Sequence, residues 1–182
     1  MSLPSNAKKV FQGVMFEVYQ WEQKLFDGST KTFEAVKRKE SVQIIATTKD
    51  KKIVLLQEEQ PLIGKFLSLP GGICNSNNFF DEAKRELLEE TGFECDDLVL
   101  WKKTGFSAKV LWDTHYFLAK NCVKTKESSL DAGEKISVFY LSFDDFVEKV
   151  LSDDFRNKEF ACMLLEMIHK NMLDDFKKLI FS

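Results

Sequence analysis

The stretch from residue 69 to residue 93 constrains the fold more than any other part of the chain, because a glycine turn is followed by a strong helix signature. Gly71 and Gly72 allow backbone conformations that other residues avoid. Asn78 is a suitable N-cap, and Gly92 stands where a left-handed C-cap would end the helix. The sequence therefore predicts a helix between these two residues, with an apolar stripe formed by Phe80, Ala83, Leu87 and Leu88.

Three carboxylates crowd one side of this predicted helix. Glu86 lies three residues before Glu89 and four before Glu90, so the side chains project from adjoining faces. Like charges at this spacing cost about 0.2–0.5 kcal/mol per pair in an isolated helix. A divalent cation such as Mg²⁺, which takes carboxylate oxygens and shares them with substrate phosphates, would reverse that effect. The alternative is a solvated helix face neutralised by Lys84 and Arg85.

The same stretch resembles a known family motif. Residues 85–93, Arg-Glu-Leu-Leu-Glu-Glu-Thr-Gly-Phe, match the second half of the Nudix (MutT-like) hydrolase box at every defined position, and Leu-Pro-Gly-Gly at 69–72 matches its usual entry. The resemblance implies an α+β fold, namely an α/β/α sandwich around a mixed central sheet with an N-terminal antiparallel strand extension. It also implies Mg²⁺-dependent hydrolysis of a pyrophosphate bond in a nucleoside diphosphate derivative.

The resemblance assigns the metal ligands. Glu86 and Glu90 would bind Mg²⁺ (or Mn²⁺) directly, Glu89 would complete or support the shell, and the main-chain carbonyl of Gly71 would add an oxygen ligand. Such cations neutralise a diphosphate and make hydroxide available near neutral pH. Arg85 would orient the glutamates through pairing at i,i+4.

The catalytic acidic residue is expected in a polar stretch near residue 134. In the resembling enzymes, the loop before the strand equivalent to residues 136–141 carries an acidic residue that binds metal or orients the attacking water. Glu134 is the best match and Asp131 the reserve. The alternative is a solvated acidic turn.

Three positions depart from the family pattern. Asn77 replaces the Glu that normally stands eight residues before the Arg, which puts the rate of the reaction in doubt more than its class. Ser68 and Glu59 fall where the ADP-ribose pyrophosphatase branch usually has Glu and Arg. These two departures concern the choice of ADP-ribose as substrate more than the class of reaction. Lys65 could supply a cation nearby, although a solvated loop lysine is the alternative.

Residues 1–40 are predicted to form an N-terminal β extension, and residues 41–182 the Nudix hydrolase domain. Residues 10–19 and 30–38 read as strands, with a turn signal at Asp27-Gly28-Ser29 between them. This region resembles the dimerisation arm of the ADP-ribose pyrophosphatase branch, in which strands are swapped in a homodimer and substrate contacts cross the interface. Trp21, Phe33 and Arg38 are the candidate substrate contacts, and an ordinary hairpin without a partner is the alternative.

The remaining chain reads as alternating strands and amphipathic helices. Strands are predicted at 41–47, 53–57, 66–69, 97–105, 114–119 and 136–141, and helices after Ser142 and at 157–173 and 174–181. Residues 107–113 and 120–135 are expected to be connections. Trp112 and His115 are interpreted as packing residues rather than as a base-stacking platform and a catalytic base.

The composition limits the partners. A net charge of −3 argues against a nucleic-acid footprint, and no apolar run approaches membrane-spanning length. The four cysteines form no C-x-x-C pair, which favours reduced thiols in a cytoplasmic protein. We therefore expect a small-molecule nucleotide diphosphate substrate, with ADP-ribose giving AMP and ribose 5-phosphate. The alternatives are a pyrophosphatase of nucleoside diphosphate sugars or other nucleotide conjugates, and a weakly active Nudix-fold nucleotide-binding module.

Overall fold

The computed structural model describes residues 2–107, 109–130 and 135–182. Its strands are β1 (Lys8–Gln12), β2 (Glu17–Lys24), β3 (Thr30–Lys37), β4 (Ser41–Thr48), β5 (Ile53–Gln60), β6 (Gly64–Ser68), β7 (Phe93–Glu94), β8 (Asp97–Ser107), β9 (Val110–Lys124) and β10 (Lys135–Leu141). Its helices are α1 (Phe79–Thr91), α2 (Phe143–Val150), α3 (Lys158–His169) and α4 (Leu173–Phe181).

The strands form one curled, mixed sheet. Its main path runs β1-β2-β3-β9-β4-β5-β10, with β6 paired to β5, and β7 and β8 paired to β9. The β3–β9 and β4–β9 pairs are parallel and the others are antiparallel. β4 is buried at nearly every position, as expected for a strand covered on both faces.

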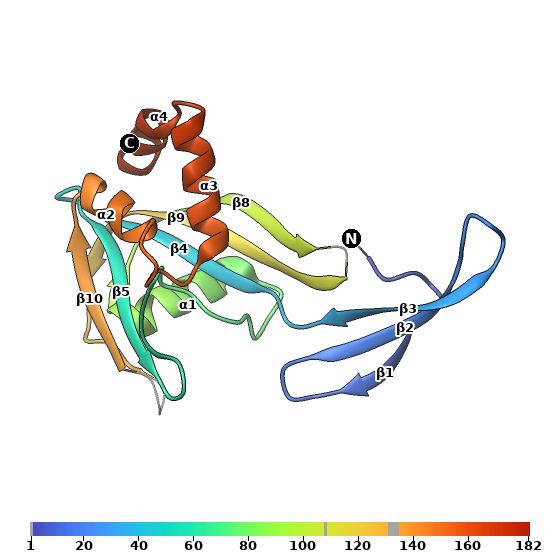
Figure 1. Cartoon of the computed structure of the whole chain (residues 1–182). Coiled ribbons are helices and arrows are strands. Elements are labelled where there is room, and N and C mark those ends of the chain that lie inside the picture. The colour runs from blue at the N-terminus through green and yellow to red at the C-terminus, as the bar shows by residue number, and fades with distance from the viewer. Residues whose placement is uncertain (1, 108, 131–134) are drawn as a thin grey trace.

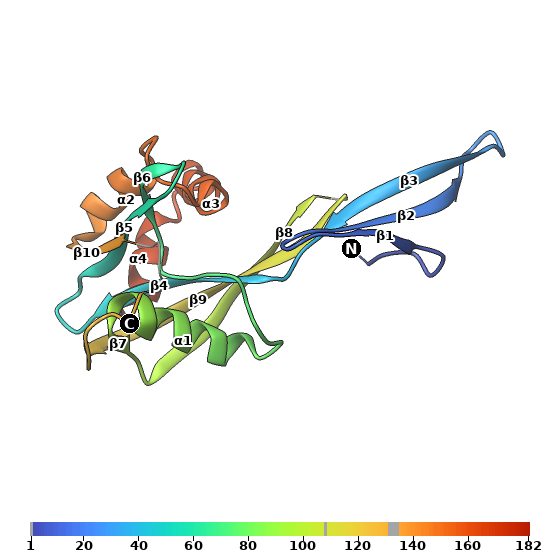
Figure 2. The ribbon, with the colours of Figure 1, turned by 90° about the horizontal axis from the view of Figure 1, so that it is seen from below.

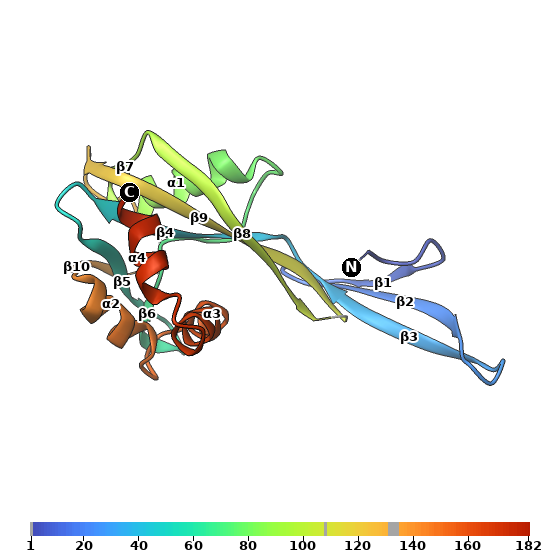
Figure 3. The ribbon, with the colours of Figure 1, turned by 90° about the horizontal axis from the view of Figure 1, so that it is seen from above.

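Helices cover both faces of this sheet, as Figures 2 and 3 show. One hydrophobic cluster packs α2, α3 and α4 against residues such as Ile45 and Leu55. A second cluster packs α1, through Ala83 and Leu87, against the opposite face. Successive residues of a strand point to opposite faces, which is why Val54 and Leu55 fall in different clusters. The predicted α/β/α sandwich with a mixed sheet is confirmed.

Strands β1, β2 and β3 form an arm that projects away from the sandwich (Figure 1). Within these three strands only Ala35 is buried. The arm joins the rest of the sheet through a short parallel pairing of β3 with β9, at Val36↔Val110 and Lys37↔Leu111. The antiparallel extension at the N-terminus is therefore present, whereas the division at residue 40 and the dimer stay predictions.

One predicted strand is wrong in its bounds. Residues 10–19 were expected to be continuous, but the backbone turns at residues 13–16, where the Gly13 N–H donates to the Phe16 carbonyl at 2.8 Å. The alternation of apolar residues runs through both strands and hides the turn. The predicted Asp27-Gly28-Ser29 turn is confirmed, since the Leu25 N–H donates to the Ser29 carbonyl at 2.8 Å.

The connections on either side of β9 are shorter than predicted. β8 and β9 leave only residues 108–109 between them, and β9 continues to Lys124. Phe117 and Leu118 lie in the middle of this strand and are buried, whereas Val123 and Lys124 at its end are exposed. Long strands that leave the core lose their apolar pattern, so pattern alone places their ends too early.

Among the described residues, no helix is both long and apolar enough to cross a membrane.

Candidate functional site

Helix α1 is fixed at both ends by its own sequence. The Asn78 side chain accepts a hydrogen bond from the Asp81 N–H, and Gly92 adopts a left-handed conformation with φ of 74° while its N–H bonds to the Leu88 carbonyl. Both predicted caps are confirmed. The apolar stripe is confirmed at Ala83 and Leu87. Phe80 is 45% exposed, although its ring meets the ring of the core residue Phe117 edge-on, and Phe79 also packs against this core.

The glycine turn meets the last turn of α1 through Glu90. The Gly71 N–H donates to Glu90 Oε2 at 2.8 Å, and the Glu90 side chain is almost fully buried. On the other side of the turn, the carbonyls of Pro70 and Gly72 accept hydrogen bonds from β4, at Ile44 and Val42. Neither of these bonds uses the Gly71 carbonyl. Two of the predicted metal ligands, Gly71 and Glu90, therefore lie in direct contact.

Gly72 leaves space for a third predicted ligand. A Cβ atom at residue 72 would lie 2.5 Å from Glu86 Oε1. At Gly71 a Cβ atom would lie 2.2 Å from the Val42 carbonyl oxygen, and φ there is +146°. The two glycines thus have different tasks: Gly71 lets the backbone pass β4, and Gly72 lets the Glu86 carboxylate approach the turn.

Arg85 joins three of the helix carboxylates. Its Nη1 donates to Glu89 Oε2 at 2.6 Å, its Nη2 donates to Glu86 Oε1 at 2.6 Å, and the same Nη2 donates to Glu82 Oε2 at 2.8 Å. The Nε–H also donates to Glu82 Oε2 at 3.3 Å. The predicted i,i+4 pair of Arg85 with Glu89 is present, and the guanidinium group offsets the repulsion between these carboxylates.

Burial and this ion-pair network act in opposite directions on the acidity of the carboxyl groups. Burial raises the pKa of Glu86, and the neighbouring Arg85 charge only partly opposes it. Burial also raises the pKa of Glu82, but hydrogen bonds from Arg85, the Asn75 backbone and the Ser76 hydroxyl outweigh it and lower that pKa to about 2. Burial lowers the pKa of Arg85, yet Glu82 and Glu86 raise it overall.

The oxygen donors of these residues fit a divalent cation, which would replace Arg85 as the partner of Glu86 and Glu89. Among the described residues, no three acidic, histidine or cysteine side chains stand arranged as a finished metal cage. The reason is visible in the hydrogen bonds, because Glu86 and Glu89 turn toward Arg85 while Glu90 turns toward Gly71. The carboxylates of α1 and the main-chain carbonyl of the adjoining glycine turn are the kinds of oxygen donor that Mg²⁺ prefers. Glu134 and Asp131 lie outside the described residues.

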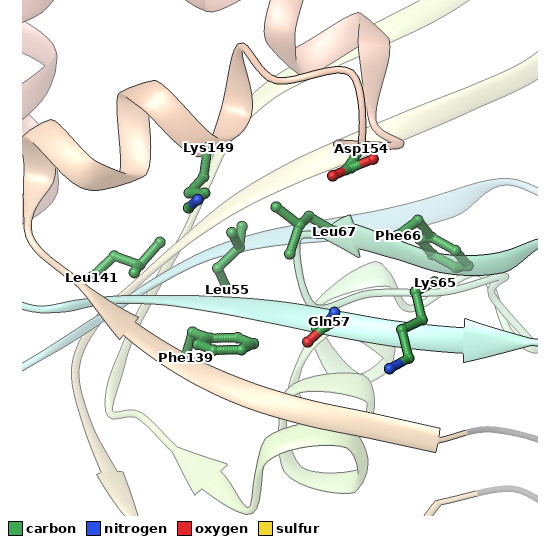
Figure 4. A pocket seen from close by; sticks show the side chains of 9 residues that line it. All are labelled: Leu55, Gln57, Lys65, Phe66, Leu67, Phe139, Leu141, Lys149 and Asp154. Atoms are coloured by element: carbon green, nitrogen blue, oxygen red, sulfur yellow. The ribbon is translucent and has the colours of Figure 1, made fainter.

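A cavity of about 380 Å³ lies beside α2, on the face of β5 opposite to α1 (Figure 4). Its apolar walls include Leu55, Leu67 and Leu141, which belong to the cluster opposite α1. Lys65 and Lys149 reach its rim. The predicted substrate contact Lys65 therefore lies at this cavity, on the face of β5 and β6 that does not carry the helix glutamates.

The other predicted substrate contacts lie on or near the arm. Trp21 and Phe33 are cross-strand partners in β2 and β3, with ring centroids 6.3 Å apart. Arg38 lies where the arm joins the sandwich, with its guanidinium carbon 4.5 Å from the centre of the Trp112 ring. The Nε of Arg38 is buried without a hydrogen-bond partner in the described part of the chain. Figure 1 shows the arm pointing away from α1, so Trp21 and Phe33 do not join the glutamates within one chain.

The comparisons with known proteins identify the family. The sequence profile of the NUDIX domain matches residues 37–164, which contain the glycine turn and all of α1. The chain belongs to the Nudix family. This confirms the family predicted from residues 69–93, and with it the class of Nudix pyrophosphohydrolase.

Three proteins are similar to this chain over most of their length. A methanol dehydrogenase activator of Bacillus methanolicus is 26% identical over 153 residues, or 80% of each chain. An ADP-ribose pyrophosphatase of Bacillus subtilis (strain 168) is 26% identical over 152 residues, also 80% of each chain. The crystal structure of an ADP compounds hydrolase matches with a TM-score of 0.68 and 21% identity, covering 92% of this chain and 93% of that one. The last likeness shows that the fold is shared.

Sequence reasoning missed two buried carboxylates of this Nudix domain. Glu82 is not among the predicted site residues, although its side chain is 7% exposed and binds Arg85. Glu58 is not among them either, although it is buried and accepts a hydrogen bond from the Ser68 hydroxyl. For Glu82 the available signal was its place shortly after Asn77, where the family pattern has lost a Glu.

Proposed function

We propose that this protein hydrolyses the pyrophosphate bond of a nucleoside diphosphate derivative with the help of Mg²⁺ or Mn²⁺. The observation that carries the proposal is the junction of the glycine turn with α1. There, Gly71 contacts Glu90 at 2.8 Å, and Gly72 leaves room for Glu86. Four acidic side chains share one helix side with a single arginine, and that surplus of negative charge suits a cation bound with a diphosphate.

The residues of α1 have distinct roles in this proposal. Glu86 and Glu90 would hold the metal, with Glu89 and the Gly71 carbonyl completing the set. When bound, the cation supplies positive charge against the diphosphate and activates water for attack. Arg85 orients Glu86 and Glu89, to which it donates at 2.6 Å each. Glu134 is the proposed residue that positions the attacking water and takes its proton, as the P–O bond to the leaving phosphate breaks.

ADP-ribose is the first candidate substrate, with AMP and ribose 5-phosphate as products. Its support is the similarity to a protein named ADP-ribose pyrophosphatase and to a structure named ADP compounds hydrolase. Glu59 and Ser68 differ from the pattern of that branch, and Glu59 lies 3.8 Å from Lys135 as an exposed ion pair. A nucleoside diphosphate sugar or another nucleotide conjugate is therefore the alternative within the same chemistry.

A second candidate is a nucleotide-binding module with little turnover. One relative is named as an activator of another enzyme, methanol dehydrogenase. In this chain, Asn77 lacks the charge of the usual box Glu, and Arg85 holds two of the proposed ligands. Tight nucleotide binding without product release would favour this candidate.

The arm is proposed to form a homodimer and to complete the substrate site. Trp21 and Phe33 of one chain would then contact the substrate held by the α1 glutamates of the other, while Arg38 would act within its own chain. Lys65 lies at the cavity on the opposite face of the sheet and has no part in this proposal. The support is that the arm leaves Val10, Phe11, Val14, Met15 and Phe16 exposed, an apolar surface that one chain alone does not cover.

A panel assay tests the proposed function. The protein is incubated with ADP-ribose, nucleoside diphosphate sugars and dinucleotides, with Mg²⁺ or Mn²⁺, and released nucleotide is measured. We expect metal-dependent release from at least one compound, and its loss on addition of a chelator. Glu90→Gln keeps an oxygen for the Gly71 N–H and should lower turnover at least about 100-fold, whereas the exposed Glu127→Gln should not change it. Full activity of Glu90→Gln would refute the ligand assignment.

A further inference from the structure

Glu82 is the most buried carboxylate that contacts Arg85. Its side chain is 7% exposed, compared with 12% for Glu86 and 42% for Glu89. Its Oε2 accepts both the Nε–H and an Nη2–H of Arg85. A buried carboxylate with two donors from one guanidinium group is a strong, geometrically defined contact. Glu82 therefore fixes the position of the Arg85 guanidinium group.

The same carboxylate lies beside the loop that precedes the helix. The Asn75 backbone and the Ser76 side chain contribute to the lowered pKa of Glu82, which places them close to its carboxylate. These residues stand directly before Asn77, the position where the family box has a Glu and this chain has none. Residue 77 is exposed, whereas Glu82 is buried between loop and helix. The junction therefore has a carboxylate, contributed from a different position of the chain.

Arg85 and a bound cation would compete for the same carboxylates. The Nη2 group of Arg85 has two N–H donors, and it bonds both Glu82 at 2.8 Å and Glu86 at 2.6 Å. A cation among Glu86, Glu89 and Glu90 would compete with the guanidinium charge for Glu86 and Glu89. Glu82 would retain Arg85 in that competition, because its buried carboxylate already accepts two N–H groups of Arg85 and it is not among the proposed ligands.

We propose that Glu82 is a positioning residue that holds Arg85, so that Glu86 and Glu89 can turn to a divalent cation. This inference rests on the proposed function, since it concerns the same metal site. It assigns Glu82 no contact with metal or substrate. Without the Glu82 charge, Arg85 would bind Glu86 and Glu89 more tightly, and the cation would have to displace it from both.

Titration with Mn²⁺ alone, followed by the loss of the free-ion electron paramagnetic resonance signal, tests this role without any turnover. Partners of ligands that act one step from the metal commonly change its affinity by about 10–100-fold. We expect Glu82→Gln to bind Mn²⁺ about tenfold more weakly than the wild type, and Glu82→Asp, which keeps the charge, to fall between them. Asp81→Asn removes one negative charge from the same helix turn without touching Arg85, and it should bind as the wild type does.

The outcomes separate the two proposals. Mn²⁺ affinity of folded Glu82→Gln equal to that of the wild type would overturn the role of Glu82 and leave the proposed function standing. An equal loss in Asp81→Asn would also overturn it, because the effect would then be one of net charge. A wild type that binds no Mn²⁺ would overturn both proposals. Circular dichroism checks the fold, and if Glu82→Gln does not fold, the comparison of Glu82→Asp with the wild type decides.

Discussion

The Ser68 hydroxyl donates a hydrogen bond to the buried carboxylate of Glu58, from β6 to the neighbouring strand β5. The Gln60 side-chain amide donates to the other oxygen of Glu58 at 3.1 Å. Ser68 stands at the position where the ADP-ribose pyrophosphatase branch usually has a Glu. In this chain the carboxylate belongs to Glu58 of β5, and Ser68 of β6 donates a hydrogen bond to it.

This relationship predicts a loss of stability in Ser68→Ala. The substitution removes a charge-assisted hydrogen bond and leaves a carboxylate oxygen buried without that donor, which costs about 1.5–3 kcal/mol. Ser137→Ala changes an exposed serine of β10 and should stay within about 0.5 kcal/mol of the wild type. Urea unfolding followed by circular dichroism measures both. A Ser68→Ala protein as stable as Ser137→Ala would contradict the importance of the Glu58 contact.

Local sequence rules predicted α1 well, because its ends and its spacing are set within the helix itself. Asn78, Gly92 and the positions of Glu86, Glu89 and Glu90 follow from capping preferences and the helical period. The burial of Glu82 did not follow from these rules, and neither did that of Glu58, which depends on a contact with Ser68 in another strand. Pattern rules assign charged residues to the surface unless a partner distant in sequence is known.

The two glycines of the turn should respond differently to alanine. In Gly72→Ala the new Cβ meets the flexible end of Glu86, which can move, so the fold should survive while metal-dependent turnover falls by about tenfold or more. In Gly71→Ala the Cβ meets the Val42 carbonyl at a φ of +146°, so the backbone itself must shift. We expect thermal unfolding to show a larger loss of stability for Gly71→Ala. The reverse order would contradict the separate tasks assigned to these glycines.

The low pKa of Glu82 predicts how one part of the stability depends on pH. Its folded pKa of about 2 lies below the ordinary value of 4.5, so the unfolded chain binds the proton more readily. The stability from the charged Glu82 is therefore fully present well above pH 4.5, and it is lost as the pH falls toward 2. The free energy of unfolding of the wild type minus that of Glu82→Gln should shrink between pH 6 and pH 3. A difference that stays constant over this range would contradict the prediction.

The cysteines should differ sharply in reactivity. Burial, and then the nearby charges of Glu82 and Glu86, raise the pKa of the Cys74 thiol to about 12, so almost no thiolate forms at pH 8. Cys162 lies exposed on α3. Iodoacetamide at pH 8 should label Cys162 in the native protein and Cys74 only after unfolding, as peptide mass spectrometry can show. Native labelling of Cys74 at the rate of Cys162 would mean that the loop opens freely.

The exposed apolar residues of the arm predict a dimer, and replacing one of them with a charged residue should weaken it. Phe11 is 58% exposed on β1, where the neighbouring Val10 is also exposed, and burial of such apolar side chains by a second chain would stabilise a dimer. Light scattering at micromolar protein should give the mass of two chains, and Phe11→Asp should weaken the association at least about tenfold. Leu62→Asp changes a fully exposed residue of the β5–β6 turn, away from the arm, and should leave the dimer intact. A monomeric mass for the wild type would contradict the swapped dimer. It would also contradict the proposed contact of Trp21 and Phe33 with the substrate of a neighbouring chain. It would not affect the proposed roles of the α1 glutamates.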